Sequence, residues 1–153
     1  MDYSLLATEI LTAAIGLLVL VLGLVLPQRG KAIVGKLSVL SLLLVLVYAI
    51  IRYNDHQSFF GGIYLVDSYG SFFKILFLIA ALLVMLSAGK YIERLRERSS
   101  EFYALMIFGT LGMMIMACAG DLITVYLGLE LMTISFYILT AYLLNDERSA
   151  EAG

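Results

Sequence analysis

Glu130 is an acidic residue in the middle of a long apolar segment, residues 121–144. It follows Asp121 by nine positions, so in an α-helix it would lie about 13 Å deeper, close to the midplane of a bilayer. A charged side chain there costs roughly 2.5–3.5 kcal/mol on insertion scales, and such residues usually face a protein interior and mark an ion path. The position therefore predicts a carboxylate that takes part in proton translocation.

Three hydroxyl-bearing residues accompany Glu130 at helical spacing. They lie four positions before it, three after it and seven after it, and they are Tyr126, Thr133 and Tyr137. Residues at these intervals share one side of a helix. A narrow polar stripe on an otherwise apolar helix can hold water or relay a proton, so we predict that these three residues support Glu130. The alternative is a purely structural carboxylate that is bonded to nearby hydroxyl groups.

Lys74 is a second candidate, because it lies more than one turn inside another apolar segment. It could support the chemistry of Glu130. Alternatively, its side chain extends to the outer surface or pairs with Asp67, two helical turns earlier. Glu9, about one turn inside the first apolar segment, is expected to reach the membrane interface. Asp121 is expected to cap the helix that follows it.

The composition predicts an all-α integral membrane protein. Of the 153 residues, 62% are hydrophobic and 14% are charged, and the mean hydropathy is +0.99. A soluble domain is closer to 45–50% apolar with roughly 25% charged residues. The net charge of −2 suggests no nucleic-acid partner. The sequence has a single cysteine, Cys118, and a single histidine, His56, so no metal site is expected. It also lacks a glycine-rich phosphate loop, so no nucleotide cofactor is expected.

Five apolar runs are long enough to cross a hydrocarbon layer of ~30 Å. They form a single membrane domain over residues 1–153, and they cover approximately residues 5–26, 33–51, 69–89, 101–120 and 121–144. In the loop between the second and third runs, Gly61 and Gly62 between apolar residues indicate a small hairpin. The Gly-x-x-Gly spacing of Gly109 and Gly112 indicates helix packing.

The distribution of basic residues predicts the orientation. Eight of them belong to one side of the membrane, and they are Arg29, Lys31, Lys36, Lys90, Arg94, Arg96, Arg98 and Arg148. The other two, Arg52 and Lys74, belong to the opposite side. Because cytoplasmic loops carry the excess of basic residues, the N-terminus is expected outside and the C-terminus in the cytoplasm.

Three stretches of the second half carry a family resemblance. They are residues 101–117 followed by Asp121-Leu122-Ile123-Thr124, then Gly128-Leu129-Glu130-Leu131, then Tyr137-Ile138-Leu139. This pattern resembles the antiporter-like membrane subunits of respiratory complex I, most of all subunit N of bacterial NADH-quinone oxidoreductase. The resemblance extends over essentially the whole chain. It implies the N-terminal portion of a longer, multi-pass subunit in the bacterial inner membrane.

The resemblance also implies a role for the whole assembly. In that family the glutamate that matches Glu130 is implicated in proton translocation together with a lysine on a later helix. The other membrane subunits of complex I, the lipid bilayer and protons are the implied partners. Partner subunits would hold the FMN, the iron–sulfur clusters and the quinone, and no cofactor is expected on this chain. The alternatives are a Mrp-type cation/proton antiporter or membrane-bound hydrogenase subunit, or a truncated, purely structural membrane fragment.

Overall fold

The computed structural model describes residues 6–26, 28–94 and 99–141, with the side chains of these ranges except those of residues 28–32 and 90–94. The described chain forms five long helices: α1 (Ala7–Val25), α2 (Gln28–Ile51), α3 (Ser68–Arg94), α4 (Ser99–Ala117) and α5 (Leu122–Thr140). In each of them an apolar stretch is long enough to cross a membrane. The expected all-α membrane fold with five spans is confirmed. Two parts of that expectation, the span ends at residues 5 and 142–144, lie outside the described residues, as do Arg96, Arg98 and Arg148.

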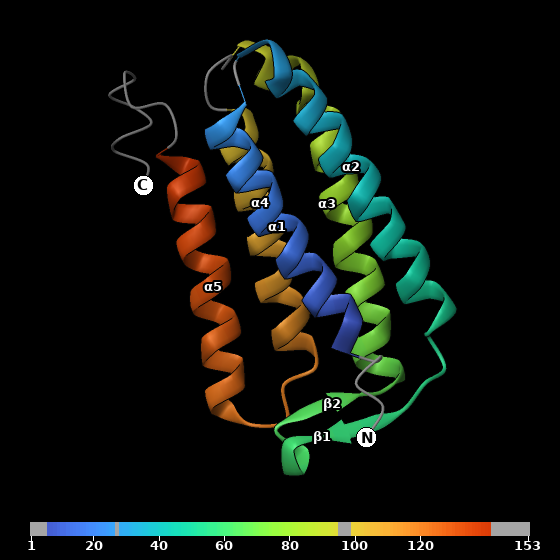
Figure 1. Ribbon diagram of the computed structural model, residues 1–153. Helices are drawn as coiled ribbons and strands as arrows, with labels where there is room; N and C mark the ends of the chain where they lie inside the picture. The colour runs from blue at the N-terminus through green and yellow to red at the C-terminus, as the bar shows by residue number, and fades with distance from the viewer. Residues whose placement is uncertain (1–5, 27, 95–98, 142–153) are drawn as a thin grey trace.

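Helix α4 lies at the centre of the bundle, as Figure 1 shows, and packs against α1, α3 and α5. Helix α2 packs against α1 and α3. The core between these helices is apolar, and its fully buried side chains include Leu42, Leu78, Ile107 and Met114. Burial of such side chains against one another is what holds the described helices in one bundle.

Glycine permits the close approach of α4 and α5. A Cβ atom on Gly112 would lie 2.6 Å from the backbone oxygen of Gly128 and 2.6 Å from the backbone nitrogen of Met132. A Cβ atom on Gly109 would meet the ring of Phe136 at 3.0 Å. Small residues let helix backbones approach within a membrane, so the packing role expected for Gly109 and Gly112 is confirmed.

A two-stranded hairpin closes one end of the bundle (Figure 1). Strands β1 (Gln57–Phe59) and β2 (Tyr64–Val66) are antiparallel, and a short 3₁₀ turn, η2 (Phe60–Gly62), connects them. The backbone φ angles of Gly61 and Gly62 are 72° and 98°, which glycine adopts without steric cost. The hairpin expected from Gly61 and Gly62 is therefore confirmed.

The connection between α4 and α5 pairs with this hairpin. The Leu65 amide donates to the Cys118 carbonyl at 2.7 Å, and the Gly120 amide donates to the Ile63 carbonyl at 2.8 Å. Helix α4 thus ends at Ala117, three residues earlier than the fourth span expected from hydropathy, because residues 118–120 run alongside β2. Asp121 then begins α5: its Oδ1 accepts from the Thr124 amide at 2.8 Å, so the expected cap is confirmed.

Candidate functional site: two carboxylates on either side of α4

Glu130 is half-buried on α5. Helix α5 is covered along one side only, where it contacts α4, and its buried residues are Gly128 and Ser135. The Tyr126 hydroxyl, one turn before Glu130, interacts with the Glu130 carboxylate. Tyr126 itself is 58% exposed and Tyr137 is 61% exposed. The acidic group therefore lies beside a wide, uncovered face of α5.

The three predicted supporting residues behave differently from one another. Tyr126 reaches the Glu130 carboxylate. The Thr133 hydroxyl donates instead to the backbone carbonyl of Glu130 at 3.2 Å. Tyr137 lies two turns further along with an exposed ring, and its backbone carbonyl accepts from the Thr140 hydroxyl at 2.9 Å. Only Tyr126 among them is in direct contact with the acidic group.

Lys74 has a different partner from the one expected. Its Nζ lies 2.6 Å from Oε1 of Glu9, which projects from α1. The expected pairing with Asp67 is wrong, because Asp67 is used at the start of α3, where its Oδ1 accepts from the Gly70 amide at 2.7 Å. Extension of Lys74 to the surface is also wrong, since only 3% of this residue is exposed. Glu9, expected at the interface, is 8% exposed, because α3 and the hairpin cover it.

Two further side chains complete the cluster around Glu9 and Lys74. The Tyr64 hydroxyl, from β2, donates to Oε1 of Glu9 at 2.7 Å. The ammonium of Lys74 also lies 5.5 Å from the centre of the Tyr64 ring, within the range of a cation–π contact. The Cys118 thiol, after α4, contacts both Tyr64 and Lys74. Four elements of the fold therefore converge on one buried ion pair.

Burial has a clear electrostatic effect on Tyr64, which lies outside the membrane-spanning helices. Its burial, and then the neighbouring negative charge of Glu9, raise the pKa of Tyr64 far above its usual value near 10. The phenol is thus held in its protonated form, in which it can donate to Glu9. Nothing in the residue types around Tyr64 indicated this contact from the sequence.

The two carboxylates lie on different sides of the central helix. Helix α5, with Glu130, packs on α4, whereas α1 and α3, with Glu9 and Lys74, pack elsewhere on α4. The predicted support of Glu130 by Lys74 therefore has no geometric basis in the described structure, where Lys74 is bonded to Glu9. Within residues 6–26, 28–94 and 99–141, no group of three His, Cys, Asp or Glu side chains is placed to hold a metal ion.

Two curated proteins that are similar to this chain have the same name. No protein-family model matches the chain. The subunit N of NADH-quinone oxidoreductase from Desulfitobacterium hafniense is 48% identical over 99% of this chain and 31% of its own length. The subunit N from Heliobacterium modesticaldum is 47% identical over 100% of this chain and 33% of its own length. The chain therefore spans about a third of the length of the curated relatives that it matches.

A solved structure agrees with these relatives. A chain of respiratory complex I from Thermus thermophilus with bound aureothin matches with a TM-score of 0.73 and 25% identity. The match covers 94% of this chain and 30% of that chain. The resemblance expected from the sequence is confirmed: along essentially its whole length, this chain is homologous to about a third of NADH-quinone oxidoreductase subunit N.

Proposed function

We propose that this chain forms part of a proton-translocating membrane subunit of NADH-quinone oxidoreductase, with Glu130 as the group that gains and loses the proton. One observation supports this proposal most directly. Glu130 is half-buried within an apolar helix, beside an exposed Tyr126 that interacts with it. A carboxylate at that depth faces protein or water rather than lipid, so further protein is expected to cover this face of α5.

The cover is expected to come from outside the described residues. The curated relatives are about three times as long as this chain, so most of each relative has no counterpart in it. The family resemblance implies a lysine on a later helix as the cationic partner of Glu130. Tyr126 would orient the carboxylate, and Thr133 and Tyr137 would line the water beside it. Lys74 is no longer proposed as a partner, because it is bonded to Glu9.

The remaining parts of the reaction belong to other subunits in this proposal. NADH oxidation, with FMN and iron–sulfur clusters, and quinone reduction would take place in partner subunits of the complex. This chain would contribute to the enzyme only through proton movement coupled to that electron transfer. Its location would be the bacterial plasma membrane, beside other membrane subunits of complex I.

The test is Glu130→Gln in the complete subunit, assembled in its complex. The substitution keeps the shape of the side chain and removes the charge that switches, so proton uptake into vesicles per NADH oxidised should fall strongly. Glu130→Asp keeps the charge and should retain more pumping. Glu101→Gln, the same change at the start of α4, is the matched control and should pump normally. Full pumping by a stably assembled Glu130→Gln complex contradicts the proposal.

The orientation is a separate proposal that rests on the eight-to-two distribution of basic residues. We propose that the N-terminus lies outside and the C-terminus in the cytoplasm. A reporter that is active only in the cytoplasm, fused after Gly153, should be active. Activity of a periplasmic reporter at the same position would reverse the orientation or change the number of spans.

A further inference from the structure

The buried pair of Glu9 and Lys74 is not accounted for by the proposed role of Glu130. Its two charged atoms are 2.6 Å apart, and both residues are more than nine-tenths buried. Removing two charges from water costs several kcal/mol per ion, and apolar residues in the same place are often as stable or more stable. That an ion pair is buried is therefore weak evidence that its role is to stabilise the fold. The hydrogen bonds of the pair indicate its role better.

The hydrogen bonds of Glu9 are distributed unevenly. Both of its donors, Lys74 Nζ at 2.6 Å and the Tyr64 hydroxyl at 2.7 Å, bind the same oxygen, Oε1. The second oxygen, Oε2, is fully buried and has no hydrogen-bond partner in the described part of the chain. An ionised carboxylate has about four lone-pair sites. One oxygen of Glu9 thus remains open to a proton or to a water molecule.

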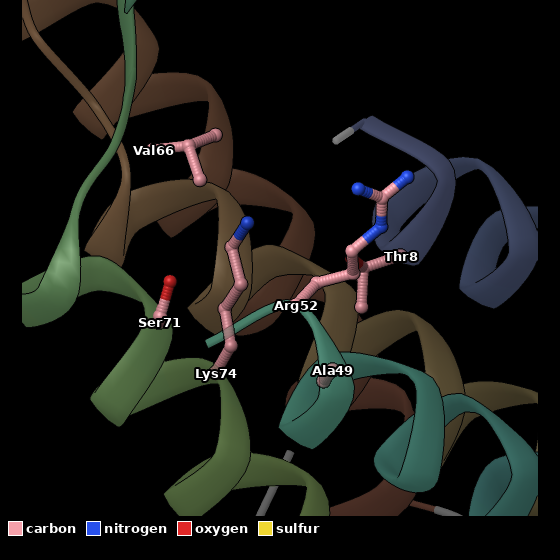
Figure 2. Close-up of a pocket in the computed structure, with 6 residues that line it drawn as sticks. All are labelled: Thr8, Ala49, Arg52, Val66, Ser71 and Lys74. Carbon is pink, nitrogen blue, oxygen red and sulfur yellow. The ribbon is translucent and has the colours of Figure 1, made fainter. Parts of the chain in front are cut away.

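A pocket next to Lys74 offers a route for water. It is lined by Thr8, Ala49, Arg52, Val66, Ser71 and Lys74, and it is large enough for about one water molecule. Figure 2 shows Lys74 and Ser71 rising from α3 on one side of this pocket, with Arg52 and Thr8 across from them. The lining residues include two that carry a hydroxyl group, Thr8 and Ser71, and two that are cationic, and such groups can bind a water molecule.

The pocket lies at the end of the bundle that the hairpin closes. Val66 in its wall belongs to β2, and Arg52 follows the last residue of α2. Arg52 is about one-third exposed and is paired with Asp55 at 2.9 Å, so its charge is already balanced at the surface. Water can therefore approach Lys74 from the hairpin end, whereas Glu9 is not among the residues that line the pocket.

We propose that Glu9 and Lys74 form a proton-exchange site, separate from Glu130, which takes up a proton from water at the hairpin end through this pocket. In the exchange, Lys74 transfers one of its protons to the Glu9 carboxylate, and its nitrogen takes a proton from hydronium in the pocket. One N–H bond and one O–H bond break, and one O–H and one N–H form. A neutral Glu9, a charged Lys74 and a water molecule remain, and no electrons are transferred.

The groups that face this site are compatible with such an exchange. From β2, the protonated Tyr64 can only donate to Glu9 and does not compete for its proton. Beyond α4, the Cys118 thiol contacts Lys74 and Tyr64. From the end of α2, Arg52 lines the pocket, and its charge is paired with Asp55. Lys74 lines the pocket and is bonded to Glu9. Its position therefore allows it to pass a proton from the pocket to Glu9.

The test uses the full 153-residue chain in lipid nanodiscs, with Glu130→Gln as the background so that Glu130 contributes no signal. After a rapid drop in pH, time-resolved infrared spectroscopy should show a protonated carboxyl band that disappears in Glu9→Gln. Ser71→Leu fills the pocket and should slow the appearance of this band at least tenfold. Ser87→Leu, on an exposed part of the same helix, is the matched control and should leave the rate unchanged.

Thr8→Val provides a second test. It replaces the hydroxyl group of a pocket residue by a methyl group, so the shape of the side chain hardly changes. This variant should also slow the appearance of the carboxyl band. Circular dichroism checks that each variant retains its helices. If no Glu9-dependent band appears while the helices persist, the pair is a fixed salt bridge and the proposal is wrong. Equal rates in Ser71→Leu and Ser87→Leu would also overturn it, because the pocket would then not be the route. Neither result depends on whether Glu130 pumps protons.

Discussion

Glu9 and Glu130 are both glutamates within apolar helices, yet their surroundings are opposite. Glu9 is covered by α3 and the hairpin, and it has a lysine at 2.6 Å and a tyrosine at 2.7 Å. Glu130 lies beside the uncovered face of α5, and in the part of the chain that the structure describes it forms no ion pair. Within the described residues, the fold therefore completes the acidic site of Glu9 with a cation and leaves that of Glu130 incomplete.

The largest effect should come from breaking the completed site. Lys74→Met leaves the Glu9 charge buried without a cation, which typically costs about 3–5 kcal/mol of folding free energy. Denaturant unfolding in detergent micelles, followed by circular dichroism, measures this loss. Lys36→Met, at an exposed position on α2, is the matched control and should cost less than about 0.5 kcal/mol. If both variants were equally stable, the buried pair would contribute no interaction that matters to the fold.

Tyr64→Phe should weaken the same site by a smaller amount. It removes one hydrogen bond to a charged group, worth roughly 1.5–3 kcal/mol, while Lys74 continues to neutralise Glu9. Unfolding in denaturant measures the loss, and Tyr53→Phe, on a half-exposed residue before the hairpin, serves as the control.

The raised pKa of Tyr64 adds a dependence on pH. Below the usual tyrosine pKa of about 10, the folded and unfolded chains both keep the phenol proton. In that range Tyr64 therefore does not make the free energy of unfolding depend on pH. Above it, the unfolded chain loses that proton while the folded chain retains it, so stability should decrease as the pH rises. Tyr64→Phe should remove this part of the decrease. An identical alkaline slope in Tyr64→Phe would contradict the assignment.

Substitution of a glycine in α4 tests how closely this helix packs against α5, the helix that carries Glu130. Gly112→Ala places a methyl group 2.6 Å from backbone atoms of α5, and such overpacking typically costs about 1–3 kcal/mol. Gly89→Ala has nothing within 4 Å of its new methyl group, so it should be neutral or stabilising by about 0.5–1 kcal/mol through its better helix propensity. Denaturant unfolding compares the two. A neutral Gly112→Ala would mean that α5 is not held closely against α4.

The smallest effect is expected for the incomplete site. Glu130→Gln in this chain should change the folding free energy by less than about 0.5 kcal/mol, because the side chain is half-exposed and interacts with an exposed tyrosine. Glu9→Gln is the same chemical change at the completed site, and it should cost several times more because it leaves Lys74 uncompensated. Equal costs in an unfolding titration would show that the two sites do not differ in this way.

The sequence was sufficient for features that depend on one element at a time. Hydropathy predicts five spans because each must cross the same hydrocarbon thickness, and Gly61 with Gly62 predicts a turn because of the backbone angles that they allow. The depth of Glu130 follows from a count along one helix. The Glu9–Lys74 pair depends on how α1 and α3 face each other, which periodicity within either helix does not determine. The only available hint was that both residues lie near the same end of the bundle with opposite charges.

The pairing of the α4–α5 connection with the hairpin has a consequence for how the length of this chain can vary. The Gly120 amide is bonded to the Ile63 carbonyl, and a Cβ atom on Gly120 would collide with the carbonyl oxygen of Gly62. An inserted residue between Ala119 and Asp121 would therefore displace both the hairpin and the start of α5. At Gly61 the surroundings are open, with nothing within 4 Å, so a short epitope inserted at this tip should be accepted. Length variation among related chains should accordingly occur at the tip of the hairpin and not at the connection before α5.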